Sequence, residues 1–236
     1  MNFDPPLVPG RLERRYKRFL ADVTLADGST ITAHCPNTGS MLGVAEPGQR
    51  VWLAHRPSPT RKYAYAWELT ELAAGTLVGV NTHLSNALVR EAIVAGAIPA
   101  LSGYAEIQAE ARYGKEGSRI DLLLKSPDRP DCYVEVKNVT AAVQDGIALF
   151  PDAVSERGTK HLRELMGVVA EGRRAVLVFC VQRGDVREVR PADGIDPAYG
   201  RTLREALSSG VEAIACGADV TPGAVRLSHL LPVVCP

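Results

Sequence analysis

Two neighbouring segments of the chain carry side chains that together could hold a metal ion and a phosphate. SRIDLLLK contains Asp121, and CYVEVKNV contains Glu135 and Lys137. Both segments alternate in the manner of β-strands, and the turn residues SPDRPD between them predict a hairpin. Centring that turn near Asp128 places Asp121 opposite Glu135, with Ile120 and Leu122 together on the other face of their strand.

In this register the two carboxylates share a face, with their Cβ atoms roughly 5 Å apart. A shift of one residue would instead send them to opposite faces. Facing carboxylates repel each other, and an unpaired Asp121 within an apolar run is costly. Mg²⁺ or Mn²⁺ would relieve both problems, because these ions favour carboxylate oxygens and leave positions for water and phosphate. Lys137 returns to the face of Glu135, where it can hold a water or stabilise a phosphoryl group.

The surrounding segments predict an α/β domain that would position this hairpin. A helix is expected from Thr82, its candidate cap, to Gly96, and it carries Glu91 as a candidate fourth member of the site. After the hairpin, DAVSERGTKHLRELMGVVAEG has helical spacing, and AVLVFCVQ has the composition of a strand buried on both faces. This order implies a right-handed parallel crossover. The alternative is a solvated cluster of Asp, Glu and Lys with no chemistry.

The first eighty residues predict a small barrel that precedes this domain. KRFLADVTL and STITAHC flank an Asp27–Gly28 turn, and RVWLAH and YAYAWELTEL supply further strands. Four or five short strands favour the OB type of barrel, with a domain boundary between about Gly75 and Thr82. The loop CPNTGSMLG either contacts phosphate, through Asn37, Thr38 and Ser40, or only closes the barrel.

The charge distribution argues against a protein coated in positive potential, because 27 basic residues balance 27 acidic ones. A local basic segment is nevertheless present in RLERRYKR, which spans residues 11–18. Its cations make it a candidate nucleic-acid interface, and a solvated charged face is the alternative. The candidate contacts are Arg14, Arg15, Lys17 and Arg18.

Other features of the composition indicate an ordinary cytoplasmic protein. The hydrophobic share is 46%, and no apolar run is long enough to cross a bilayer. The first ten residues lack the pattern of an export signal. The five cysteines are scattered and show no C-x-x-C spacing, which favours reduced thiols. We therefore expect a cytoplasmic location and no membrane partner, while the oligomeric state stays open.

The order of elements resembles the restriction-endonuclease-like fold, whose motif is written PD-(D/E)-x-K, with Ile120 in place of the motif's proline. The chain resembles one family still more closely, the sugar fermentation stimulation protein (SfsA) family. Segments similar to the signature segments of that family occur in order along the chain: YKRFLADV, HCPNTGSM, GVNTHLSN, SRIDLLL, YVEVKNVT, FPDAVSERGTKHL and FCVQR.

The resemblance implies an OB-like barrel at residues 1–79, followed at residues 80–236 by a nuclease-like domain with a mixed sheet. It also implies non-specific DNA binding and a link to the regulation of sugar metabolism. Asp121, Glu135 and Lys137 carry over as a nuclease-type triad, and Glu91 as the helix glutamate of many such folds. Arg157, Lys160 and His161 lie where related nucleases contact the phosphate backbone, although a solvated helix face would also explain them.

These features lead to two principal hypotheses of function and a weaker third. The first is a nuclease dependent on Mg²⁺ or Mn²⁺, in which Asp121 and Glu135 hold the metal and Lys137 positions water. The second is a DNA-binding regulator that keeps the fold without turnover. The third is a binding module for sugars or proteins. The facing carboxylates favour the first hypothesis, because a pure binder does not need two of them beside its phosphate contacts.

Overall fold

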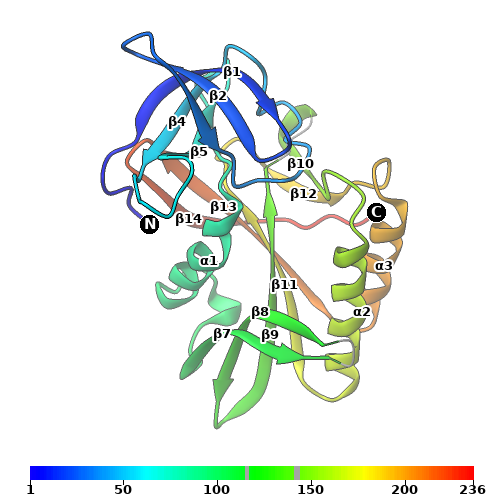
Figure 1. Cartoon of the computed structure of the whole chain (residues 1–236). Coiled ribbons are helices and arrows are strands. Elements are labelled where there is room, and N and C mark those ends of the chain that lie inside the picture. The colour runs from blue at the N-terminus through cyan, green and yellow to red at the C-terminus, as the bar shows by residue number, and fades with distance from the viewer. Residues whose placement is uncertain (115–116, 141–143) are drawn as a thin grey trace.

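The computed structural model describes residues 1–114, 117–140 and 144–236 (Figure 1). Its first part is a closed barrel, in which the antiparallel order β3-β2-β1-β4-β5-β6 is completed by a parallel pairing of β3 with β5. This closure gives the OB-type barrel that the sequence predicts. The strands are β1 (Val8–Tyr16), β2 (Leu20–Leu25), β3 (Thr30–His34), β4 (Arg50–His55), β5 (Tyr65–Glu71) and β6 (Leu77–Gly79).

Alternating strand sequences explain the interior of the barrel. Inward side chains such as Leu12, Val23, Leu53 and Trp67 have no solvent exposure and form one core cluster. The predicted hairpin turn is present between β2 and β3, where Gly28 has a φ of 83° that favours glycine.

The second part is a mixed six-stranded sheet in the order β14-β13-β11-β9-β8-β7. Strand β11 is parallel to both β9 and β13, whereas the β7-β8-β9 and β13-β14 pairs are antiparallel. The predicted α/β domain with a mixed sheet is confirmed. Its strands are β7 (Glu106–Tyr113), β8 (Ser118–Ser126), β9 (Arg129–Val139), β11 (Arg174–Val181), β13 (Glu212–Thr221) and β14 (Ala224–Leu231), and a separate parallel pair consists of β10 (Ile147–Phe150) and β12 (Glu188–Pro191).

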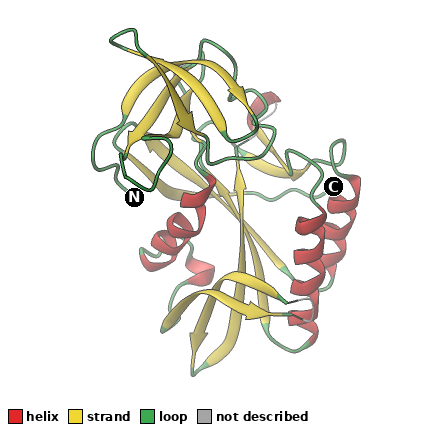
Figure 2. Ribbon diagram, viewed as in Figure 1, coloured by secondary structure: helices red, strands yellow, loops and turns green. Residues whose placement is uncertain are grey.

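Helices cover the two faces of this sheet, with α1 (Ser85–Val94) on one side and α2 (Glu156–Ala170) and α3 (Pro197–Ser208) on the other (Figures 1 and 2). Each face has its own core cluster. The start of α2 is capped by Ser155, whose hydroxyl accepts the N–H of Gly158, and Asp196 caps α3 in the same way. Among the described residues, no helix is both long and apolar enough to span a bilayer.

The segment that joins the two parts differs from the prediction in how it begins. A 3-10 turn (Thr82–Leu84) precedes α1, and the side chain of Asn81, not that of Thr82, accepts an N–H, from His83. The Thr82 hydroxyl instead donates to the carbonyl of Pro36 at 2.7 Å. The predicted cap at Thr82 is therefore wrong, because its hydroxyl fastens the joining segment to the barrel.

The first residues of the chain lie against the second part of the molecule. The N–H of Phe3 donates to the carbonyl of Gly223 at 2.8 Å, next to β14. Phe3 and Leu7 are buried in the core cluster that contains α1, and Ala54 of the barrel also belongs to that cluster. One apolar cluster therefore spans the contact between the barrel and the α/β part.

Candidate functional site

Asp121 and Glu135 lie where the β8–β9 ladder ends. Leu122 pairs with Val134 and Leu123 with Tyr133, so one further step in this register sets Asp121 against Glu135. The register that the sequence predicts is therefore confirmed from Leu122 onward. That the two carboxylates share a face stays a prediction, since Asp121 contacts Asn86 of α1 and Glu135 contacts His161 of α2. Among the described residues, the backbone pairing of the two strands begins at Leu122, which leaves the acidic residues at the point where the ladder ends.

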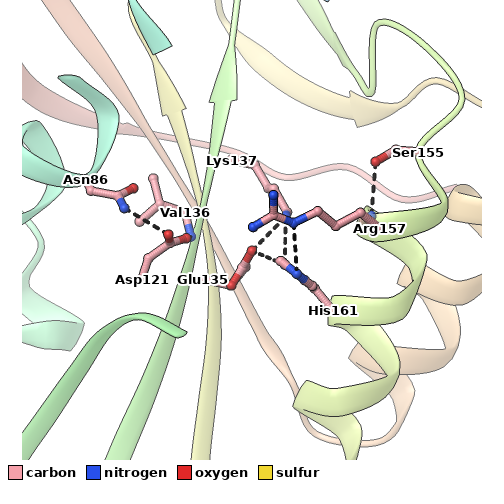
Figure 3. A network of polar contacts seen from close by, with 9 residues as sticks. Asn86, Asp121, Glu135, Val136, Lys137, Ser155, Arg157 and His161 are labelled. Atoms are coloured by element: carbon pink, nitrogen blue, oxygen red, sulfur yellow. Dashed lines mark hydrogen bonds and ion pairs between the residues drawn. The ribbon is translucent and has the colours of Figure 1, made fainter. Parts of the chain in front are cut away.

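The carboxylate of Asp121 lies in the gap between the two strands. Its Oδ2 accepts the backbone N–H of Val136 at 2.7 Å, and its Oδ1 accepts the side-chain amide of Asn86 on α1 at 2.8 Å (Figure 3). If the ladder continued, Ile120 would lie opposite Val136. The side chain of Asp121 therefore takes the place of a backbone acceptor for the N–H of Val136. The carboxylate thus satisfies an N–H that the separating strands would otherwise leave without a partner.

Near Asp121, the side chains of β7 and β8 change the sheet face to which they point, and this change produces the placement of the Asp121 carboxylate. Glu110, the residue of β7 opposite Asp121, has a φ of 55°, a backbone conformation that non-glycine residues rarely adopt. On either side of Asp121, Ile120 packs in the cluster with α2, whereas Leu122 packs in the cluster with α1. The expectation that Ile120 and Leu122 share a face is wrong, because the strand pair twists at this point.

Glu135 is the most deeply buried member of the site, with 2% of its surface exposed. Its Oε1 accepts the ammonium of Lys137 at 2.7 Å and also contacts Nδ1 of His161 on α2 (Figure 3). Its Oε2 is buried and has no hydrogen-bond partner among the residues that the structure describes. Since buried polar atoms normally have a partner, this oxygen is free to accept a ligand.

The contacts of His161 determine which ring nitrogen carries the proton. Nε–H of Arg157 donates to Nε2 of His161 at 3.3 Å, so Nε2 is the acceptor and Nδ1 carries the hydrogen of the neutral ring. Nδ1–H can then donate to Glu135. The ammonium of Lys137 lies 3.3 Å from the same Nδ1. Because both groups are then donors, the partner of that ammonium is the carboxylate.

The two carboxylates differ in how readily they ionise. Burial raises the pKa of Asp121, and the charge of Glu135 raises it further. Burial alone would also raise the pKa of Glu135, but the hydrogen bond from His161 and the charge of Lys137 lower it overall. At neutral pH Glu135 therefore stays ionised, while Asp121 forms no ion pair with any residue that the structure describes.

The donor set fits a hard divalent cation. Each oxygen of Asp121 accepts one hydrogen bond and keeps a lone pair, and Oε2 of Glu135 keeps both. No group of three or more His, Cys, Asp or Glu side chains converges as metal ligands in the described part of the chain. Two carboxylates suit an ion that retains water or phosphate oxygens, as Mg²⁺ does, better than one held entirely by protein.

Glu91 is not brought to this site. Its carboxylate pairs with the amino group of Met1 at 2.8 Å and is half exposed, beside an apolar groove between α1 and β14. Five positions along a helix amount to about 140° of rotation, so Asn86 and Glu91 face different directions. The prediction of Glu91 as a fourth member is corrected: α1 presents Asn86 to Asp121 instead.

The predicted nucleic-acid contacts on the barrel fall into two groups. The guanidinium of Arg14 pairs with Asp22 at 2.8 Å, and that of Arg15 donates to the carbonyls of Arg18, Asn37 and Gly39. These two side chains are thus occupied within the barrel. Lys17 and Arg18, by contrast, are exposed in the β1–β2 turn, and no ion pair of theirs occurs among the described residues.

The loop after β3 connects the barrel to the segment before α2. The side chain of Asn37 accepts the N–H of Gly39, and Ser40 and Met41 both donate to Asp152. A cavity of about 340 Å³ lies beside this loop and reaches Ser155 at the start of α2. Of the predicted contacts on α2, Arg157 is exposed and Lys160 is half buried.

Sequence reasoning placed His161 among phosphate contacts and missed its position against Glu135. The signal that could have found it is the apolar stripe of α2, because His161 adjoins Leu162 and lies one turn before Leu165. Both leucines are fully buried, so a residue on their side of the helix faces the sheet. Asn86 gave no comparable signal, since its contact depends on where the β8 strand twists.

Comparisons with known proteins agree with this architecture. A family model described as the SfsA N-terminal OB domain matches residues 14–80, and one described as the sugar fermentation stimulation protein RE domain matches residues 83–224. A sugar fermentation stimulation protein homolog of Thioalkalivibrio sulfidiphilus is 63% identical over 99% of this chain and 98% of its own length. One of Alkalilimnicola ehrlichii is 60% identical over the whole of both chains.

A solved structure extends the similarity to three dimensions. It is described as that of Pyrococcus furiosus SfsA in complex with Ca²⁺. The two folds superpose with a TM-score of 0.87 at 28% identity, covering 99% of this chain and 98% of the other. Both parts of the molecule, the barrel and the mixed-sheet domain, are therefore shared with that protein.

Proposed function

The chain belongs to the sugar fermentation stimulation protein family, and from this premise we propose that it is a cytoplasmic nucleic-acid-binding protein with a metal-dependent phosphodiesterase site. DNA is the favoured substrate, and Mg²⁺ or Mn²⁺ is the favoured ion. Asp121 and Glu135 would hold the ion, and Lys137 would assist the reaction. The link to sugar metabolism rests on the family name.

One observation carries the proposal. The buried Oε2 of Glu135 has no partner in the described part of the chain, and it belongs to the residue opposite Asp121 where the two strands separate. A hard cation would give that oxygen a ligand and would reduce the repulsion between the carboxylates. The related protein from Pyrococcus furiosus was solved in complex with Ca²⁺, an ion with the same preference for oxygen ligands.

The side chains around the carboxylates have separate roles in this proposal. When bound, the ion would polarise a phosphoryl oxygen and lower the pKa of a bound water. Lys137, 13% exposed, would hold that water or stabilise negative charge on the phosphoryl group. His161 would keep the carboxylate of Glu135 oriented. Arg157, exposed on the first turn of α2, would contact a neighbouring phosphate.

A second candidate is a DNA-binding regulator without turnover. The observation that favours it is the ion pair between Lys137 and Glu135, which occupies the ammonium that catalysis would need. In such a protein the carboxylates would bind an ion that only neutralises charge beside phosphate. Metal would then strengthen binding to nucleic acid without causing cleavage.

The test is incubation of the protein with labelled single-stranded DNA, duplex DNA and RNA, with Mn²⁺ or with a chelator. Asp121→Asn removes the negative charge at nearly constant volume, and Asp219→Asn is the matched control at an exposed position on β13. Cleavage that requires Mn²⁺, is lost in Asp121→Asn and persists in Asp219→Asn supports the enzyme. Metal-stimulated binding with no cleavage of any substrate would favour the regulator, and loss of activity in both variants would contradict the assignment of the site.

A further inference from the structure

The barrel contains a second cavity. Thr82, which donates a hydrogen bond to Pro36, lines the cavity beside α2, whereas Pro36 lines this second cavity. Its volume is about 380 Å³, within the range of about 300–1,000 Å³ that small-ligand sites occupy. Residues of β3, β5 and the β4–β5 loop line it, together with Asn81 and His83 of the joining segment. We call this cavity the barrel pocket.

The rim of the barrel pocket is positively charged. Arg56, Arg61 and Lys62 of the β4–β5 loop are all exposed, and none of the three forms an ion pair within the described part of the chain. Burial lowers the pKa of the His34 imidazole, and the nearby charges of His83 and then Arg61 lower it further. Three unpaired cations around one opening attract an anion.

Glu68 is the one acidic residue in the lining, and it is buried. Its side chain is 1% exposed, and its Oε2 accepts the amide of Asn81 at 2.7 Å. Burial raises the pKa of Glu68, which favours its neutral form. The floor of the pocket is therefore polar and the rim cationic.

The wall of the pocket offers aromatic surface to a ligand. Tyr63 and Tyr65 are half buried, and the ammonium of Lys62 lies 5.6 Å from the ring centroid of Tyr63. His55 stacks on Tyr65, with centroids 4.5 Å apart, and holds that ring in place. A ligand that matches both features carries negative charge and a flat aromatic group.

We propose that the barrel pocket binds one nucleotide of a single-stranded nucleic acid, with phosphates at Arg56, Arg61 and Lys62 and the base against Tyr63. Unpaired bases expose the faces that aromatic side chains stack on, whereas a duplex buries them. The loop that supplies the cations is one of the two that OB barrels use for oligonucleotides. The proposal shares its partner, nucleic acid, with the proposed function, but it requires no metal.

The test measures the affinity of the full-length protein for fluorescent oligo-dT, oligo-U and a DNA duplex, in chelator and at several salt concentrations. The pocket variant is Arg61→Ala with Lys62→Ala, and the control is Arg201→Ala with Arg226→Ala, which removes equal charge from exposed positions of the α/β part. Tyr63→Leu tests stacking with no change of charge. Thermal melting checks that every variant is folded.

Wild-type protein should bind a single strand more tightly than the duplex, and the tighter of the two single strands identifies the source as DNA or RNA. The pocket variant should lose about 1.4 from the slope of log affinity against log salt, since each phosphate contact on a single strand contributes about 0.7. Tyr63→Leu should lose roughly tenfold in affinity with the slope unchanged. The control should match wild type.

Equal losses in the pocket and control variants, or wild-type affinity in the pocket variant, would overturn the proposal, as would a wild-type preference for the duplex. Measurement in chelator separates this proposal from the proposed function, because the barrel pocket requires no metal whereas the phosphodiesterase site does. Failure of cleavage in wild type would leave the expected losses at the barrel pocket unchanged.

Discussion

Two substitutions of His161 separate its contact with Glu135 from its contact with Arg157. The side-chain nitrogen of Asn stands as many bonds from Cβ as Nδ1 of His does, and that of Gln as many as Nε2. His161→Asn can therefore still donate to Oε1 of Glu135, whereas His161→Gln places its amide near Arg157 and leaves Glu135 with Lys137 alone. Both variants are neutral, as is the imidazole whose Nε2 accepts from Arg157, so neither changes the formal charge.

The structure sets the size of the expected effects. Glu135 is 2% exposed, so losing one donor to its charge should cost His161→Gln about 1.5–3 kcal/mol of unfolding free energy. Loss of a group that orients a metal ligand typically weakens metal affinity by about 10- to 100-fold. We expect that loss in His161→Gln and wild-type affinity, within about threefold, in His161→Asn.

Calorimetric titration with Mn²⁺ alone measures the affinity, and chemical denaturation in chelator measures the stability. Neither assay requires turnover, so the result does not depend on a substrate. Equal Mn²⁺ affinity in the two variants would refute the view that Nδ1–H orients Glu135. Wild-type affinity in both would show that Lys137 is sufficient to hold the carboxylate.

Three further results are expected. Because the pKa of Asp121 is raised on folding, its contribution to stability is complete below the unfolded-state pKa and is lost as pH rises through the folded-state pKa. Thermal melting in chelator should show this loss. Mn²⁺ should restore the stability of wild type but not that of Asp121→Asn. Glu91→Ala should keep the wild-type Mn²⁺ affinity and cost at most about 1 kcal/mol in denaturation, since its ion pair is largely exposed. Arg15→Ala should lower the melting temperature through three lost carbonyl contacts, whereas Lys17→Ala should not.

The sequence was sufficient for the register of the central hairpin but not for its local shape. Alternation and the turn residues placed Asp121 opposite Glu135, because a hairpin fixes pairing by the position of its turn. They could not reveal that Ile120 and Leu122 face different helices. That change depends on the left-handed backbone of Glu110, a residue type with no strong preference for it.

Polar partners were predicted less well than the elements that carry them. Helix α1 was expected, yet Asn86 rather than Glu91 reaches Asp121, because a twist in the neighbouring strand decides which helix face meets the carboxylate. Clustered cations likewise indicated a basic segment in β1. The cluster did not show that Arg14 and Arg15 have partners within the barrel, since those partners come from other strands and loops.

The docking of the first residues against β14 imposes an order on folding during synthesis. The barrel strands pair with one another and can close soon after residue 79 leaves the ribosome. Phe3, however, finds its backbone partner at Gly223, which is translated after the whole of the barrel. Until then the segment that carries Phe3 and Leu7 stays undocked on a finished barrel, and its apolar side chains are open to chaperones or to other nascent chains. A ribosome stalled before β14 would therefore hold a folded barrel beside an exposed apolar segment.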